Sequence, residues 1–189
     1  MSPSVVVLDA CTLYPAALRD VLMRLALHQL IHARWTDAIH DEWIEAVLRD
    51  RQDLTRERLQ RTRELMDFHS EGSLVTGYEH RIQDLELPDK DDRHVLAAAI
   101  ETEADSILTW NLKDFPVALL ASHGIHATTP DELLSRLSKD HPEEMITVLR
   151  EARLCLRQPP VSAAEYLATL SNQGLIRTCA ILQPRIHEL

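Results

Sequence analysis

Residues 5–9 have the sequence VVVLD, an unbroken apolar run rich in β-branched residues that ends in a carboxylate. Such a run predicts a strand buried on both faces, as in a parallel sheet, with Asp9 at its carboxyl end. Weaker runs of the same kind predict further short strands over residues 33–35, 73–77, 106–110 and 125–128.

Helical periodicity fills the segments between these predicted strands. We expect helices over residues 15–31, 37–50, 55–69, 89–104 and 117–123. Pro15 suits the start of the first helix, and Thr36 is a good N-cap for the second. Strands that alternate with helices imply a parallel sheet with right-handed crossovers, so the sequence predicts the α/β class.

From residue 130 onward the pattern changes to helices alone. They are expected over residues 130–139, 142–156, 162–171 and 174–183, with breaks at Pro142, at Pro159-Pro160 and at Gly174. We place a boundary near Thr129. The sequence therefore predicts two regions, a catalytic α/β region over 1–129 and a helical C-terminal region over 130–189.

The composition limits the classes of function. The chain has 189 residues and a net charge of −10, which argues against a broad basic surface for nucleic acid. Residues 1–130 hold 22 acidic and 13 basic side chains, whereas residues 131–189 hold 8 and 7. Three cysteines without a CxxC pair favour a reducing compartment. With neither a signal-like leader nor an apolar run of 18 residues, we expect a cytoplasmic protein without a membrane span.

The positions of polar oxygens are more informative than their number. Asp9 ends the first strand, Glu42 lies in the second helix, Asp92 opens the helix near residue 92, and Asn111 and Asp114 follow the strand 106–110. In an open parallel sheet, ligands bind at the carboxyl ends of the strands. Carboxylates drawn together there need a cation, and oxygen ligands without histidine or cysteine favour Mg²⁺ or Mn²⁺. This pattern predicts metal-assisted phosphodiester hydrolysis, although acids at helix starts also occur as plain caps.

Several neighbouring residues have two interpretations each. Asp89 and Asp91 could bind metal or cap the helix that Asp92 opens. Thr12 could support a ligand carboxylate or make an ordinary turn bond. Arg93 and Lys113 could meet phosphate or balance the acids.

Six arginines crowd residues 49–63, where the local net charge is +3. They could form a patch that faces RNA, or a solvated helix with local ion pairs such as Glu57–Arg61.

Four segments together resemble the PIN-domain family. They are VVVLDACTLYP (5–15), RWTDAIHDEW (34–43), LPDKDDRHVLAAAI (87–100) and ILTWNLKDFP (107–116). The likeness is strongest to the VapC-like branch that carries an extra helical C-terminal region.

The resemblance implies a three-layer α/β/α fold and a Mg²⁺- or Mn²⁺-dependent endoribonuclease, the toxin of a toxin–antitoxin pair. It implies that Asp9, Glu42 and Asp92 are the first three acids, with the fourth position on Asn111, Asp114 or both. The implied partners are an RNA substrate, with tRNA or another structured RNA as candidates, a cognate antitoxin, and a second copy of the chain in a homodimer.

Three other functions could use parts of the same pattern. A phosphatase that uses an aspartyl nucleophile needs a second Asp two residues after Asp9, where this chain has Cys11. A non-catalytic RNA- or protein-binding module is disfavoured by the complete set of acids. A DNA nuclease could use the same acids, and nothing in the sequence distinguishes the two polymers.

Overall fold

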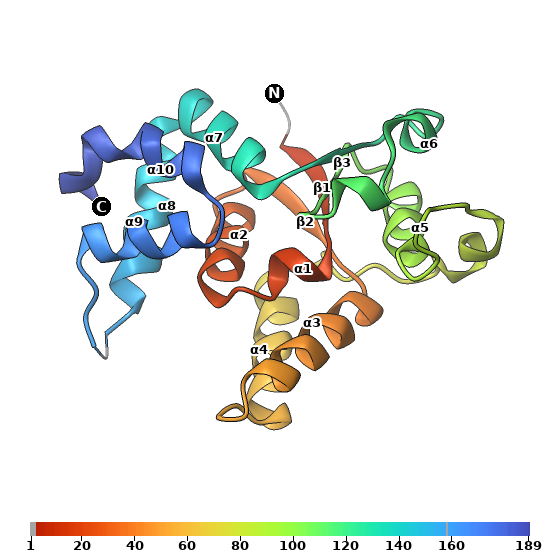
Figure 1. The fold of residues 1–189 in the computed structure, drawn as a ribbon, viewed down its shortest axis with the longest axis horizontal. Helices are drawn as coiled ribbons and strands as arrows, with labels where there is room; N and C mark the ends of the chain where they lie inside the picture. Colours follow the sequence, from red (N-terminus) through yellow and green to blue (C-terminus); the bar gives the residue numbers. More distant parts are fainter. Residues whose placement is uncertain (1–2, 158) are drawn as a thin grey trace.

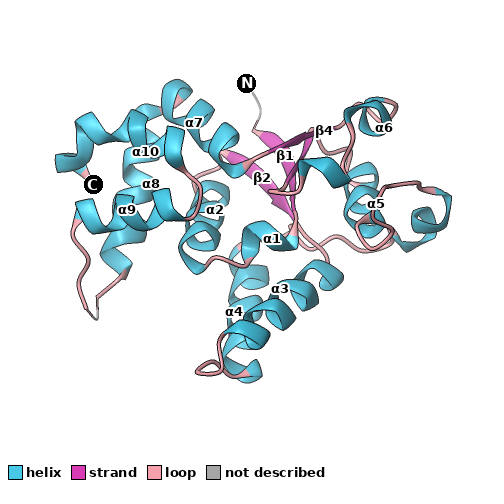
Figure 2. Ribbon diagram, viewed as in Figure 1, coloured by secondary structure: helices cyan, strands magenta, loops and turns pink. Residues whose placement is uncertain are grey.

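The computed structural model describes residues 3–157 and 159–189, and the described chain contains one parallel sheet of four strands (Figures 1 and 2). The strands are β1 (Ser4–Leu8), β2 (Ile31–Arg34), β3 (Ser106–Leu108) and β4 (His126–Thr128), in the spatial order β2-β1-β3-β4. The VVVLD run thus forms a central strand, and Val6, Val7 and Leu8 are fully buried.

Helices connect the strands. They are α1 (Ala10–Leu13), α2 (Ala16–Leu27), α3 (Asp37–Asp50), α4 (Arg56–His69), α5 (Arg93–Glu101) and α6 (Val117–Ala121), with short 3-10 helices η1 (Glu79–Asp84) and η2 (Leu112–Asp114). The Thr36 hydroxyl accepts the N–H of Ile39 and caps α3, as the sequence predicts.

The strand order places a topological switch beside Asp9. The chain leaves β1 toward β2 on one side and later returns to β3 on the other side. Right-handed crossovers in opposite directions put their helices on opposite faces of a sheet. Figure 1 accordingly shows α2 and α5 on either side of the strands, and the predicted α/β class is confirmed. The carboxyl ends of β1 and β3 lie side by side at this switch, where ligands bind in open α/β sheets.

The helix predicted over residues 15–31 is too long. It ends at Leu27, and Gln29 turns the chain with a φ of +57°. Ile31 then starts β2 and pairs with Ser4. The apolar periodicity continues through this turn because both elements bury side chains in the same core, so periodicity alone could not locate the end of the helix.

The strand predicted over residues 73–77 is also wrong. Only an isolated bridge between Leu74 and Trp35 forms there. Gly72 precedes the segment and Gly77 ends it, with φ values of +80° and +81°, so the backbone leaves the extended conformation at both ends. The helix predicted over 89–104 begins only at Arg93, after a turn in which Asp89 accepts the N–H of Asp91.

The C-terminal region is helical, as predicted. Its elements are α7 (Pro130–Asp140), α8 (Pro142–Cys155), α9 (Ala163–Asn172), α10 (Ile176–Leu182) and the 3-10 helix η3 (Gln183–Glu188). Thr129 and Glu132 form a capping box at the start of α7. The region packs on α2 through α8 and α9, and its buried side chains join the same apolar cluster as those of the sheet. The boundary near Thr129 stays a prediction.

Among the described residues, no helix has the length and apolar character needed to cross a bilayer. Cys11, Cys155 and Cys179 are all free thiols.

Candidate active site

Asp9 lies directly after β1, at the N-cap position of α1, and is 5% exposed. Its Oδ2 atom accepts hydrogen bonds from the Thr109 hydroxyl at 2.6 Å and from the Cys11 thiol at 3.1 Å. Burial and the nearby Asp9 carboxylate raise the pKa of Cys11 to about 12, so its thiol stays protonated and can donate. The end of β3 and the first turn of α1 therefore hold one oxygen of Asp9 in a fixed place.

Asp92 occupies the N-cap position of α5, where its side chain makes no capping hydrogen bond. Burial raises the pKa of its carboxyl group to about 7, and nearby carboxylates add to the shift. These carboxylates are, in order of effect, Asp9, Asp89, Asp114 and Glu42. The connection that precedes α5 thus brings Asp92 to the same edge of the sheet as Asp9, as the predicted site requires.

Glu42 projects from α3 and pairs with a histidine that the sequence analysis did not single out. Its Oε1 atom lies 2.8 Å from Nε2 of His94, whose side chain is 11% exposed. The Nδ1 atom of His94 is buried and has no partner among the described residues. Because a carboxylate only accepts, Nε2 carries the hydrogen of this contact and donates it to Glu42.

A buried network fixes the helix that carries Glu42. The Trp43 indole donates to Nδ1 of His40 at 3.0 Å, and Nε2 of His40 lies 3.2 Å from Asp67 on α4. The Trp35 indole donates to the same Asp67 oxygen. Because these groups are satisfied inside the protein, α3 is held rigidly against its neighbours.

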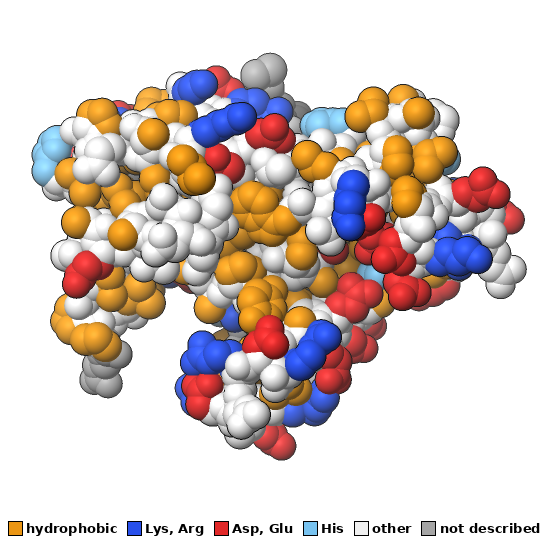
Figure 3. All heavy atoms as spheres, in the orientation of Figure 1, with side chains coloured by type: hydrophobic (Ala, Val, Ile, Leu, Met, Phe, Trp, Pro, Cys, Tyr) orange, Lys and Arg blue, Asp and Glu red, His pale blue; other side chains and the backbone are white. Residues whose placement is uncertain are grey.

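A cavity of about 360 Å³ connects the acidic residues. Asp9, Glu42, Asp92 and Asn111 line it, together with Ala10, Cys11, Tyr14, Trp43 and Ala46. Figure 3 shows acidic side chains gathered where α3 faces the part of the molecule that contains α5. Of the two candidates for the fourth position, Asn111 lines the cavity, whereas Asp114 acts on Asp92 through its charge.

No three acidic, histidine or cysteine side chains in the described part of the chain are arranged closely enough to hold a metal ion as they stand. In this arrangement Asp9 is hydrogen-bonded to Thr109, and Glu42 is hydrogen-bonded to His94. The structure therefore brings the predicted acids to one cavity without forming a closed ligand cage.

Other candidates occupy different places. The Thr12 hydroxyl is fully buried and donates to the main-chain carbonyl of Asp9 at 2.7 Å, so Thr109 takes the supporting place considered for Thr12. The Arg93 side chain turns back and donates to the Lys90 carbonyl at 3.0 Å. Lys113 is exposed on η2, close to the cavity in sequence.

Among the described residues, four of the six arginines in the segment 49–63 form ion pairs, either with nearby residues or with α3. Arg51 pairs with Asp53, Arg56 with Glu45, Arg61 with Glu64, and Arg63 with Asp37 and Asp41. Arg61 therefore pairs with Glu64 and not with Glu57, the partner that the sequence suggested. This arrangement favours a solvated helix over a patch that faces RNA.

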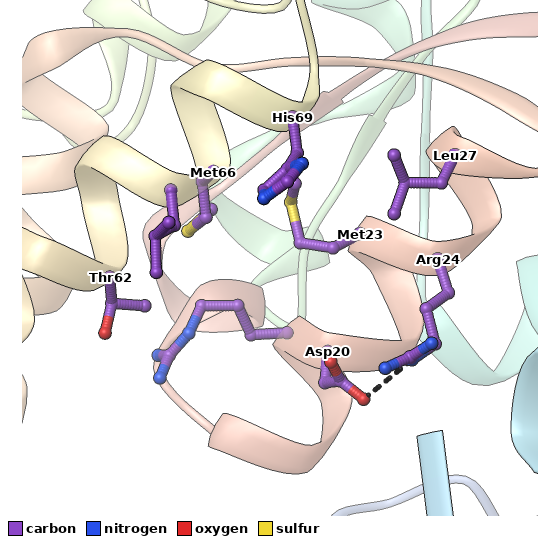
Figure 4. A pocket seen from close by; sticks show the side chains of 9 residues that line it. Asp20, Met23, Arg24, Leu27, Thr62, Met66 and His69 are labelled. Carbon is purple, nitrogen blue, oxygen red and sulfur yellow. Dashed lines mark hydrogen bonds and ion pairs between the residues drawn. The ribbon is translucent and has the colours of Figure 1, made fainter. Parts of the chain in front are cut away.

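A second hollow of about 330 Å³ lies between α2 and α4 (Figure 4). Met23, Leu27 and Met66 form apolar walls. The acidic residue in its lining, Asp20, is paired with Arg24 at 3.0 Å. This hollow therefore lacks the crowded carboxylates that mark the first cavity.

The comparisons with known proteins agree with this architecture. A family model described as PIN domain matches residues 5–113, which is more than half of the chain. The chain therefore belongs to the PIN-domain family, and the resemblance found in the sequence is confirmed.

A second family model, described as VapC50 C-terminal domain, matches residues 130–184. The chain is also 51% identical over 82 residues to a protein of Mycobacterium tuberculosis named "Putative ribonuclease VapC50". That match covers 43% of this chain and 48% of the relative, so it spans about half the length of the curated protein. No solved structure matches the chain.

Proposed function

We propose that the chain is a Mg²⁺- or Mn²⁺-dependent endoribonuclease and the toxin of a VapBC-like pair in the cytoplasm. The observation that carries the proposal is the convergence of Asp9, Glu42 and Asp92 on one cavity at the switch point of the sheet. The relative's name supports RNA as the substrate class. We propose tRNA and other structured RNAs as the first substrates to test.

The donor set fits a hard divalent cation. Carboxylates of Asp9, Asp92 and Glu42, with Asn111 or Asp114 in the fourth position, supply only oxygen atoms, which Mg²⁺ and Mn²⁺ prefer. The raised pKa of Asp92 also supports a cation site, because a positive charge placed between crowded carboxylates relieves their repulsion. A bound ion would supply positive charge to the phosphoryl oxygens and lower the pKa of water.

The side chains around the cavity have distinct roles in this proposal. Thr109 and Cys11 orient Asp9, and His94 orients Glu42. Glu42 is 44% exposed and faces solvent, so it is placed to position the attacking water. Lys113 is the candidate for contact with phosphate. Arg93 would have to leave the Lys90 carbonyl to do the same.

Cleavage assays on matched RNA and DNA strands test the proposal. The wild type with Mn²⁺ should cut RNA, and Asp9→Asn should lose at least about 100-fold of the rate, because loss of a direct ligand should exceed the 10–100-fold cost of losing an outer hydrogen bond. Cleavage of DNA alone would favour a DNA nuclease. RNA binding without cleavage would favour a non-catalytic module.

An antitoxin is the partner that we propose for a toxin of this kind. We infer that it would insert a basic side chain among the carboxylates, because a cation there relieves their repulsion as a metal ion would. An inhibitor complex in which no basic residue approaches Asp9 would contradict this. A homodimer stays a prediction, which the molar mass in solution would test.

A further inference from the structure

The turn between α9 and α10, residues 173–175, lies against the end of β3. A Cβ atom on Gly174 would lie 2.8 Å from Cη2 and 3.3 Å from Cζ3 of the Trp110 ring. These separations are shorter than van der Waals contact, and Gly174 has a φ of +98°. Both the backbone conformation and the packed indole therefore require glycine at this position.

The residue before Gly174 makes a second contact with the catalytic region. Oε1 of Gln173 accepts the main-chain N–H of Leu18 at 3.2 Å. Leu18 lies in the first turn of α2, where helix N–H groups lack partners within the helix. The same turn therefore touches both the strand end that carries Trp110 and the start of the helix that follows Asp9 and α1.

The backbone of Trp110 is joined directly to the groups that hold Asp9. Its N–H donates to Sγ of Cys11 at 3.3 Å, and the N–H of Asn111 donates to the Thr109 hydroxyl at 2.9 Å. Cys11 and Thr109 in turn both donate to Asp9. The position of Trp110 therefore sets the position of the whole donor group.

We propose that the α9–α10 turn is a positioning element of the active site, which acts by seating Trp110. The C-terminal region is then part of the catalytic unit, because its α9–α10 turn packs on Trp110, just after the carboxyl end of β3. The role in catalysis rests on the proposed function, but the effect on the geometry around Trp110 does not.

Gly174→Ala tests the contact, and Gly72→Ala is its matched control. Gly72 has a similar φ of +80°, but a Cβ there would meet nothing within 4 Å. Both variants should lower the melting temperature through backbone strain, Gly174→Ala by more because its Cβ also meets the indole. Only Gly174→Ala should shift the backbone amide NMR signals of Cys11, Thr109 and Asn111, and weaken Mn²⁺ binding by about 10-fold in a titration without RNA.

Trp110→Phe provides a rescue, because it removes the far ring atoms that a Cβ on residue 174 would meet. The double variant Gly174→Ala/Trp110→Phe should bind Mn²⁺ as Trp110→Phe does. If Gly174→Ala fails to fold, Trp110→Phe alone serves as the test, since it opens a gap above Gly174 and should weaken Mn²⁺ binding; unchanged affinity would overturn the positioning role.

The possible outcomes separate the two proposals. Amide signals in Gly174→Ala that match those of Gly72→Ala would overturn the positioning role, as would unchanged Mn²⁺ affinity in a protein whose wild type binds Mn²⁺. A wild type that neither binds Mn²⁺ nor cleaves RNA would instead overturn the proposed function, even if the amide signals shifted as expected.

Discussion

Asp92 and Asp131 both lie at the start of a helix, one in each region of the chain, yet their surroundings are opposite. Asp131 is 8% exposed and accepts the N–H groups of Arg177 and Thr178, each at 2.9 Å, and the Thr178 hydroxyl at 2.8 Å. Asp92 makes no capping bond and is crowded by other carboxylates. An acid that is surrounded by donors stabilises the fold, whereas one that is surrounded by other acids lowers stability and marks a place for a cation.

The largest expected effect is on catalysis. Asp92→Asn should reduce metal-dependent RNA cleavage by at least about 100-fold, because it removes a charged oxygen from the proposed metal site. The exposed neighbour Asp91 is the matched control, and Asp91→Asn should lose far less activity. Equal losses in initial rates under saturating Mn²⁺ would show that Asp92 has no special role.

Replacing Asp131, the acid that is surrounded by donors, should affect the stability of the fold more than catalysis. Asp131→Ala leaves two main-chain N–H groups and a hydroxyl without their acceptor, which should lower the free energy of unfolding by about 3 kcal/mol. The melting temperature should fall by about 2–4 °C for each kcal/mol. The folded fraction should lose far less cleavage rate than Asp92→Asn does, because Asp131 does not line the cavity. A variant that unfolds at the same denaturant concentration as the wild type would contradict this assignment.

A smaller effect is expected at His94, which acts through Glu42. His94→Ala should weaken Mn²⁺ binding by about 10-fold, because Glu42 loses the donor that fixes its carboxylate. His94→Gln can still offer an N–H and should recover most of the affinity. If Gln and Ala behave alike in direct Mn²⁺ titrations, the hydrogen bond to Glu42 is not the reason for the effect.

The smallest effect concerns pH in protein freed of metal with a chelator. The Asp92 pKa rises from its ordinary 3.8 to about 7 in the folded chain, so the folded state binds its proton more tightly than the unfolded state does. This contribution is present at low pH and is lost as pH rises from about 4 to about 7. The melting temperature of Asp92→Asn should therefore match the wild type near pH 4 and exceed it by a few degrees, roughly 2–4 °C per kcal/mol, near pH 8. A constant difference across this range would contradict the shift.

Much of the fold could be predicted because its signals are local. The apolar run at 5–8 gave β1, and Thr36 marked the start of α3. The end of α2 at Leu27 could not be predicted, because the turn at Gln29 depends on where β2 must begin to pair with β1. Residues 73–77 do not form the predicted strand. Whether a short apolar run becomes a strand depends on a partner to pair with, and composition alone does not show that partner.

Some residues of the candidate site could be predicted from local sequence signals, and others could not. Asp9 and Asp92 stand out in the sequence because acids at strand ends and helix starts have a recognised geometry. The roles of Thr109 and His94 as hydrogen-bond donors to Asp9 and Glu42 could not be predicted from the sequence. Thr109 reaches Asp9 only because β3 pairs with β1. His94 sits in an ordinary helical pattern, and its position two residues after Asp92 was the one local signal available.

A crystal soaked in Mn²⁺ and measured at the manganese absorption edge tests the central claim most directly. Anomalous density is expected in the cavity of about 360 Å³, with oxygen ligands from Asp9 and Asp92 and the Glu42 carboxylate close by. Density elsewhere on the protein, with Asp9 and Asp92 still apart and bound only to protein donors, would contradict it.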